Sequence, residues 1–166
     1  MSNGTIGAIC GSGPEMTALA YGKAMSALLQ KKKVILIQFM KGSQEDFDWS
    51  LIKRLEPELK MFHFEKANKC FHDLADDEKE DARLNIRNGL NFAKKVMATA
   101  ECDLLILDEL LGLLEHQIIS MEDFKHMISC QGNVELVLTG RVLGPELAEF
   151  VESVEEIRQV KIDKAE

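Results

Sequence analysis

Two stretches of the sequence combine residue types that could bind a phosphate group and a metal ion. The first is the turn Gly11-Ser12-Gly13-Pro14-Glu15-Met16-Thr17, which lies between a short apolar run and a segment with apolar residues at helical spacing. The second is the apolar run 104–107, which ends in the adjacent carboxylates of Asp108 and Glu109. The N–H groups of a glycine turn at the start of a helix can converge on a phosphate, and an acid at a nearby strand end can hold Mg²⁺. Together the two stretches predict the phosphate loop and the acidic strand of a nucleotide-binding domain.

The turn departs from the usual phosphate loop in its charges. Such a loop ends in Gly-Lys-Ser/Thr, whereas Glu15 and Met16 precede Thr17 in this sequence. A carboxylate near a phosphate repels it, methionine offers no hydrogen-bond donor, and Pro14 removes one backbone N–H group from the turn. We therefore expect the position of a phosphate loop to be kept and its affinity for ATP to be reduced.

Basic residues follow two further segments that we expect to be strands. Lys41 comes after the apolar run 34–37, and Arg141 comes after the segment 134–138. Ligands of open parallel sheets bind at the carboxyl ends of the strands, so both residues would face the same crevice as the glycine turn. Arg141 could neutralise a phosphate there, or it could pair with a neighbouring acid at the surface.

The elements that must position these residues alternate between strands and helices. Strands are expected near residues 5, 34, 60, 104, 134 and 156, with helices between most of them. The runs 34–37 and 104–107 are apolar throughout, as in strands that are buried on both faces. This alternation predicts an α/β fold, a mostly parallel five- to six-stranded sheet flanked by helices, in a single domain over residues 1–166. The segment 60–64 would be a strand at the edge of the sheet.

Apolar spacing also predicts which helix faces are buried. The first helix is expected to bury a face made of Ala18, Tyr21, Met25 and Leu28. A long helix that starts at Asp76 is expected to bury a face made of Ala82, Ile86, Leu90, Ala93 and Met97. Ser120 opens a capping box for a helix that ends at Ile128, and the last strand is expected over 154–161.

Composition and charge narrow the class of protein. Hydrophobic residues make up 46% of the 166 residues, which excludes a globally disordered chain. The formal charge of −8 argues against nucleic acid or an anionic membrane as the main partner. No apolar run approaches the roughly 20 residues that span a bilayer, and no signal peptide is present, so we expect a cytoplasmic protein. The four cysteines form no CxxC pair and are expected to be free thiols, and His63 and His72 are expected at the surface.

The motifs stand in an order that resembles one family over nearly the whole chain. Besides the glycine loop, the segments QFMKG at 38–42, LLILDEL at 104–110 and VLTGR at 137–141 resemble the ATP:corrinoid adenosyltransferases, which have a RecA-like P-loop fold. The resemblance implies transfer of the 5′-deoxyadenosyl group from ATP to the cobalt of a reduced corrinoid, with release of triphosphate. It also implies an electron-donating reductase as a partner, and a homodimer.

The resemblance further implies a role for each candidate residue. The Thr17 hydroxyl and Glu109 would hold Mg²⁺, and Asp108 would support that site. Lys41 and Arg141 would supply positive charge, so these two residues and Asp108 are the expected catalytic residues. The loop that wraps the triphosphate of ATP would consist of Gly11, Ser12, Gly13, Pro14, Glu15, Met16, Thr17 and Ala18.

The altered loop leaves an alternative to catalysis open. Family members carry Gly-Lys where this chain has Glu15 and Met16, so the lysine that reaches the phosphates is missing. The alternative is a catalytically inactive member that binds a corrinoid or a partner chain without turning over ATP. A different nucleotide-binding ATPase or kinase is the weaker interpretation, because it would need the missing lysine.

Overall fold

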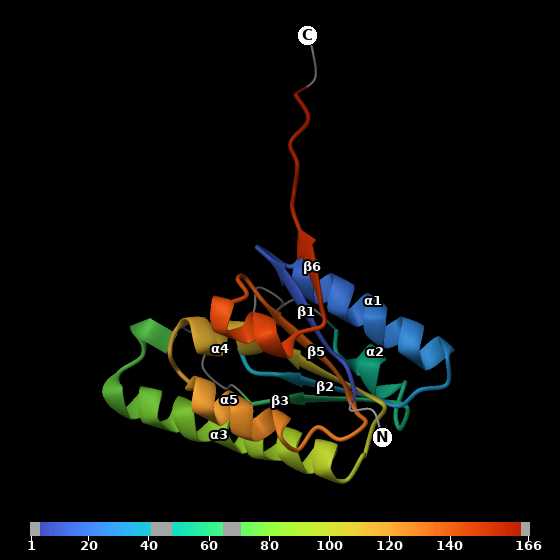
Figure 1. Cartoon of the computed structure of the whole chain (residues 1–166), viewed down its shortest axis with the longest axis horizontal. Coiled ribbons are helices and arrows are strands. Elements are labelled where there is room, and N and C mark those ends of the chain that lie inside the picture. The colour runs from blue at the N-terminus through green and yellow to red at the C-terminus, as the bar shows by residue number, and fades with distance from the viewer. Residues whose placement is uncertain (1–3, 41–47, 65–70, 164–166) are drawn as a thin grey trace.

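The computed structural model describes residues 4–40, 48–64 and 71–163, in which six strands form one sheet (Figure 1). The strands are β1 Ile6–Gly11, β2 Val34–Gln38, β3 Leu59–His63, β4 Leu104–Asp108, β5 Glu135–Gly140 and β6 Ser153–Ile157. They lie in the order β3-β2-β4-β5-β1-β6, and every neighbouring pair runs parallel. The structure therefore confirms the α/β fold and the parallel sheet that the sequence predicts.

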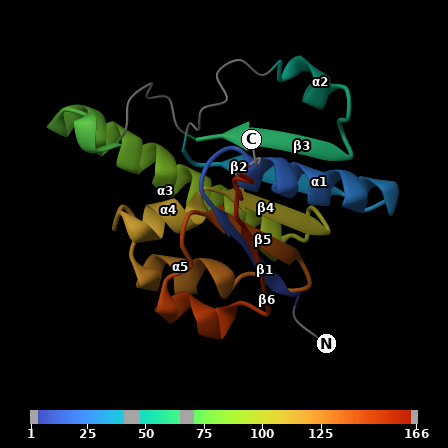
Figure 2. The same cartoon turned by 90° about the horizontal axis from the view of Figure 1, so that it is seen from above.

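Helices cover both faces of the sheet. They are α1 Glu15–Leu29, α2 Ser50–Lys53, α3 Asp76–Ala98, α4 Leu110–Glu115 and α5 Met121–Ile128, with short 3₁₀ turns η1 Phe71–Asp73 and η2 Pro145–Phe150. α1 packs on one face, and α3, α4 and α5 pack on the other (Figures 1 and 2). None of the helices in the described residues is long and apolar enough to cross a membrane.

β2 and β4 form the buried centre of the sheet, as their apolar runs predict. Every residue of both strands is buried, because helices cover both faces. Leu36 and Ile106 pack against α1, whereas Ile37 and Leu107 belong to the larger apolar cluster on the opposite face. β3 lies at one edge of the sheet, as expected for the segment 60–64, and β6 lies at the other edge.

The predictions for α3 and α5 are confirmed. The α3 residues that were expected to be buried are all buried, namely Ala82, Ile86, Leu90, Ala93 and Met97. At the start of α5 the Ser120 Oγ accepts a hydrogen bond from the Asp123 N–H at 3.0 Å. The Ser120 N–H donates to Asp123 Oδ2 at 2.9 Å, which completes the capping box.

The buried face of α1 differs from the prediction. Ala18 and Met25 are exposed, and Tyr21 and Leu28 are only partly buried. The buried side chains of α1 are Met16, Thr17, Ala20, Ala24 and Ala27. The predicted face was wrong because α1 is apolar around much of its circumference, so spacing alone could not select the inner face. The small alanines bring the backbone of α1 close to the sheet and hold its first turn beside β4.

The last strand is shorter than the sequence predicts. β6 ends at Ile157, four residues before the expected end of the strand at Lys161. Its neighbour β1 ends at Gly11, which pairs with Ile157, so no strand in the described part of the chain lies beside the residues that follow. Residues 158–163 continue away from the sheet instead (Figure 1).

We predict that Gly140→Ala destabilises the protein by about 2–3 kcal/mol, because α4 packs directly against this glycine. A Cβ atom on Gly140 would lie 2.3 Å from the Cβ of Leu111 and 3.1 Å from the backbone nitrogen of Gly112. Urea unfolding followed by circular dichroism measures the change. The matched control is Gly144→Ala, where a Cβ atom would meet no atom within 4 Å. Equal unfolding curves for the two variants would contradict the close contact between α4 and β5.

Candidate active site

The carboxyl ends of four neighbouring strands bring the sequence motifs together at one edge of the sheet. β1 leads through residues 12–14 into α1, β2 ends in Gln38, β4 ends in Asp108, and β5 contains Thr139. The four strands lie in the order β2-β4-β5-β1, so polar side chains from distant parts of the chain meet here. This edge is where open parallel sheets bind their ligands.

Asp108 is the centre of the polar cluster. Its side chain is fully buried, with 0% of its surface exposed. Asp108 Oδ1 accepts hydrogen bonds from Thr139 Oγ1 at 2.7 Å and from Thr17 Oγ1 at 3.3 Å. Asp108 Oδ2 accepts a hydrogen bond from Gln38 Nε2 at 3.2 Å. Donors on β5, α1 and β2 thus hold one carboxylate at the end of β4, and they fix the Thr17 hydroxyl beside it.

Glu109 lies in the sharp connection between β4 and α4. Its backbone adopts φ 64°, a left-handed conformation that is uncommon outside glycine. The Glu109 N–H donates to Thr139 Oγ1 at 2.8 Å, so the same hydroxyl binds the backbone of Glu109 and the side chain of Asp108. Gly112 leaves room for the Glu109 carboxylate, since a Cβ atom there would lie 3.3 Å from Glu109 Oε2. The two acids are therefore held in fixed and different orientations.

The electrostatics of the two acids favour a cation. Burial raises the pKa of Asp108 above its ordinary value, although its hydrogen bonds and the nearby His63 oppose the shift. Burial raises the pKa of Glu109 to about 7, the negative charges of Asp108 and Glu115 add to this shift, and Arg141 opposes it. Arg141 offsets only part of the negative charge of the two acids. A divalent cation bound beside them would therefore favour the ionised form of both carboxyl groups.

The loop before α1 combines uncapped backbone N–H groups with a nearby carboxylate. Gly13 adopts φ 92°, a left-handed conformation that glycine accepts without strain. The first N–H groups of α1 have no partner within the helix, and no side chain caps them. Glu15 Oε2 lies only 2.7 Å from the position that a Cβ atom on Gly13 would take. N–H groups that could bind a phosphate and a negative charge that would repel it therefore share one turn.

Met16 packs into the core beneath the loop. Its side chain is 2% exposed and belongs to the apolar cluster of α1, where Ile9 and Leu36 are also buried. A lysine in the same orientation would bury its ammonium group without a partner, which is strongly unfavourable. The side chain of Met16 thus contributes to the fold, and only its backbone N–H can contribute to a bound ligand.

The structure brings together part of the predicted site. Thr17, Asp108 and Glu109 meet at the end of β4, and Arg141 is exposed within reach of the Glu109 charge. Lys41 lies outside the described residues, so its role stays a prediction. The other predicted loop residues are at least partly exposed around the start of α1, namely Gly11, Ser12, Gly13, Pro14, Glu15 and Ala18.

Gln38 and Thr139 are site residues that the sequence analysis missed. Both are buried polar side chains at the ends of apolar strands, and both donate hydrogen bonds to Asp108. The signal was present in the sequence, because a polar residue that ends a fully apolar strand needs a hydrogen-bond partner.

His63 is exposed as expected, and its ring contacts Trp49 edge to face with the ring centroids 5.6 Å apart.

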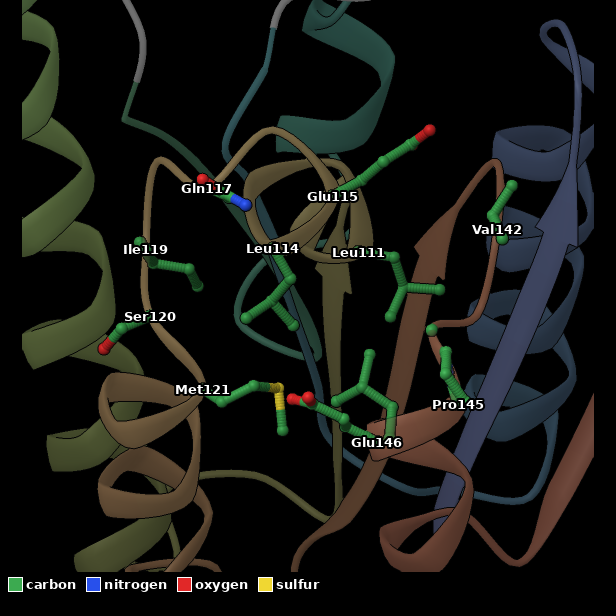
Figure 3. A pocket seen from close by; sticks show the side chains of 12 residues that line it. Leu111, Leu114, Glu115, Gln117, Ile119, Ser120, Met121, Val142, Pro145 and Glu146 are labelled. Atoms are coloured by element: carbon green, nitrogen blue, oxygen red, sulfur yellow. The ribbon is translucent and has the colours of Figure 1, made fainter.

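An apolar pocket of about 500 Å³ lies beside α4, the helix that follows the acid pair in the chain (Figure 3). Leu111 and Leu114 of α4 line it between two sides, with Ile119 and Met121 on one side and Val142 and Pro145 on the other (Figure 3). Glu115 and Glu146 contribute its charged groups, and none of the described residues that line it is a lysine or an arginine. The pocket therefore suits an uncharged and largely apolar ligand surface better than a phosphate.

Comparisons with known proteins agree on one family. Residues 2–165 match the family described as "ATP:corrinoid adenosyltransferase BtuR/CobO/CobP". The corrinoid adenosyltransferase of Escherichia coli (strain K12) is 26% identical over 159 residues, which cover 95% of this chain and 78% of that protein. The corrinoid adenosyltransferase CobA of Salmonella typhimurium (strain LT2) is 24% identical over 159 residues, again 95% of this chain and 78% of that protein.

A solved structure shares the fold at low sequence identity. The KaiC-like protein PH0186 from Pyrococcus horikoshii OT3 superposes with a TM-score of 0.58 and 14% identity, over 96% of this chain and 75% of that chain. This likeness, together with the parallel sheet, confirms the RecA-like P-loop fold that the sequence predicts. Because the sequence match extends over nearly its whole length, the chain belongs to the ATP:corrinoid adenosyltransferase family.

Proposed function

We propose that the protein transfers the 5′-deoxyadenosyl group of ATP to the cobalt of a reduced corrinoid. The observation that carries the proposal is the gathering of Thr17, Asp108 and Glu109 beside a turn with phosphate-loop geometry. Membership of the family supports the choice of the two reactants. In this reaction the cobalt(I) centre forms a bond to C5′ of ATP, and the C5′–O bond breaks with its electron pair leaving on triphosphate. The protein then has to position two reactants and stabilise the leaving group.

The donor set at the acid pair fits Mg²⁺, because all of its ligands would be oxygen atoms. The Thr17 hydroxyl and the Glu109 carboxylate would hold the ion, and Asp108 would keep Thr17 in place through their hydrogen bond. The raised pKa of Glu109 fits the same role, since a divalent cation favours the ionised carboxylate. When bound, Mg²⁺ would reduce the charge that develops on the triphosphate.

The chain's own groups would bind the triphosphate from two sides. The N–H groups at the start of α1 would contact its oxygen atoms, and Arg141 would approach from the end of β5. Lys41 would add a second cation, as the resemblance implies. With Met16 buried in the core, these groups would have to supply the binding that a loop lysine supplies elsewhere.

The apolar pocket would receive part of the corrinoid. It is lined by α4, which follows the acid pair in the chain, and by residues that follow Arg141, so a ligand in it would lie on the same side of the sheet as these groups. Its leucines and its lack of basic lining residues favour an uncharged macrocycle edge over a phosphate. An external reductase would supply the electrons that produce cobalt(I).

A binding protein without turnover is the alternative that the charges of the loop favour. The Glu15 carboxylate lies against Gly13, where it would meet the phosphates of ATP. The side chain at position 16 points into the core and offers no cation. In this alternative the pocket still binds a corrinoid, while the nucleotide side of the site stays unused.

We predict that the purified protein binds MgATP with micromolar affinity and adenosylates a chemically reduced corrinoid. Isothermal titration calorimetry measures the binding, and the absorbance spectrum of the corrinoid measures the reaction without the unknown reductase. Corrinoid binding without any heat from millimolar MgATP would contradict the enzyme and support the binding protein.

We predict that Glu15→Gln raises the affinity for MgATP about tenfold, which corresponds to ~1.4 kcal/mol from one removed repulsion near the phosphates. The matched control is Glu80→Gln on the exposed side of α3, which makes the same change in net charge far from the loop. Calorimetry on both variants at one salt concentration measures the effect. Equal affinities for the two variants would mean that the phosphates do not occupy this turn.

We predict that Glu109→Gln raises the free energy of unfolding at pH 8 by roughly 2–3 kcal/mol in the absence of Mg²⁺. The pKa of Glu109 is raised from 4.5 to about 7 by folding, so its charge destabilises the folded state above pH 7 and has no effect below pH 4.5. As the pH rises between these two values, the native protein should lose stability. The variant should keep most of that stability.

Urea unfolding between pH 4.5 and 8 tests this dependence. Glu80→Gln is the control, because Glu80 is an exposed residue on α3 and is not among the charges that shift the pKa of Glu109. Its unfolding free energy should stay within about 0.5 kcal/mol of the native value. Parallel pH profiles for the native protein and Glu109→Gln would show that Glu109 is solvated in the folded state.

A further inference from the structure

A groove of about 200 Å³ between α3 and the start of α5 carries a cluster of cations. Arg83, Arg87 and Lys94 of α3 line it, together with the amide of Asn91. These four residues recur at steps of three or four, so they form one stripe along the helix. The stripe is a local excess of positive charge in a chain whose formal charge is −8. We call this pocket the basic groove.

Buried apolar side chains also line the basic groove. Ile86 and Leu90 come from α3, and Ile118 and Ile119 come from the connection between α4 and α5. Apolar walls lower the local dielectric constant, so the field of nearby cations is stronger in such a groove than on an open surface. An anion bound there would therefore interact strongly with the three cations.

The charges of the three cations are not neutralised by the residues around them. Within the described residues, none of the three forms an ion pair with a carboxylate. The Cζ atom of Arg83 lies over the ring of Phe71, 5.1 Å from its centroid. Lys94 Nζ donates to Nδ1 of His126 at 3.0 Å, because an ammonium group can only donate. A ring face and a neutral imidazole leave both positive charges in place.

The carboxylate that lines the basic groove already has hydrogen-bond donors of its own. Asp123 Oδ2 accepts hydrogen bonds from the Ser120 N–H at 2.9 Å and from Ser120 Oγ at 2.7 Å. These hydrogen bonds lower the pKa of Asp123, and the charges of Lys94 and Arg87 add to the shift. One carboxylate thus faces three cations. Like charges four residues apart destabilise a helix, so a bound anion would relieve the repulsion between Arg83 and Arg87.

We propose that the basic groove binds a phosphate group, as an anion site separate from the turn before α1. A guanidinium group can donate two parallel hydrogen bonds to phosphate, and an ammonium group adds a point charge. The site is separate because α1 packs on one face of the sheet and α3 packs on the other (Figure 2). The inference does not rest on the proposed function, since inorganic phosphate alone can test it.

The phosphate group has two possible sources. Ile119 lines both the basic groove and the apolar pocket of Figure 3, so the two cavities are neighbours. A ligand in the apolar pocket that carries a phosphate on a flexible chain could therefore place it in the groove. The nucleotide tail of a corrinoid contains such a phosphodiester. The second source is a free phosphate ion.

Nuclear magnetic resonance of the full chain, titrated with inorganic phosphate at constant ionic strength, tests the site. The side-chain Nε–H signals of Arg83 and Arg87 should shift and reach saturation. Arg87→Gln should raise the dissociation constant about tenfold, because it removes charge-assisted hydrogen bonds. The matched control is Arg54→Gln at the end of α2, which removes an exposed charge outside the groove and should leave the constant almost unchanged.

Two neighbouring lysines of α3 provide a second matched pair. Lys94 lines the basic groove, whereas Lys95 is exposed and does not line it. Lys94→Gln should weaken phosphate binding, and Lys95→Gln should not. Circular dichroism spectra that match the native spectrum show that both variants are folded. Arginine signals that do not saturate with phosphate, or equal binding by the two lysine variants, would overturn the proposal.

Cyanocobalamin and dicyanocobinamide distinguish the two sources, because only the first carries the phosphodiester of the nucleotide tail. If a corrinoid supplies the phosphate, cyanocobalamin should bind more tightly, displace inorganic phosphate, and lose this advantage in Arg87→Gln. If the phosphate is a free ion, both corrinoids should bind alike and leave the arginine shifts unchanged. Either result supports an anion site once the phosphate titration has succeeded. Failure to bind either corrinoid would count against the proposed function and not against the phosphate site.

Discussion

The buried carboxylate of Asp108 is the constraint on which the rest of the site depends. A carboxylate with 0% exposure requires donors, and it finds them on α1, β2 and β5. These hydrogen bonds fix the first turn of α1 against the sheet and hold the Thr17 hydroxyl at the strand ends. Thr139 also fixes the position of Glu109, because its hydroxyl oxygen accepts a hydrogen bond from the backbone N–H of that residue. One buried charge thus sets the positions of the phosphate loop and of the second acid.

Most of the fold could be predicted because its strongest signals are local. The apolar runs of β2 and β4 and the apolar stripe of α3 bury the residues that their spacing selects. α1 could not be oriented in this way, since apolar residues surround most of it and only contact with the sheet chooses the inner face. The end of β6 also depends on a non-local fact, the end of its partner strand at Gly11.

The sequence predicts where the site residues lie better than it predicts which hydrogen bonds they make. Thr17, Asp108 and Glu109 stand where the motifs place them, because strand order in a parallel sheet brings carboxyl ends together. The hydrogen bonds of Gln38 and Thr139 depend on which residues face each other across neighbouring strands, and this pairing cannot be read from a single segment. The orientation of Met16 likewise follows from the buried face of α1, which the spacing of the sequence left undecided.

The loss of the loop lysine changes which group must neutralise a bound triphosphate. Glu15, Asp108 and Glu109 bring negative charge to the strand ends, and among the described residues Arg141 is the cation that opposes the charge of Glu109. A nucleotide without a metal ion would add more negative charge to a site that already raises the pKa of its own acids. The proposed nucleotide binding would therefore rely on a divalent cation more than in a loop that carries its own lysine, and the acid pair would hold that cation.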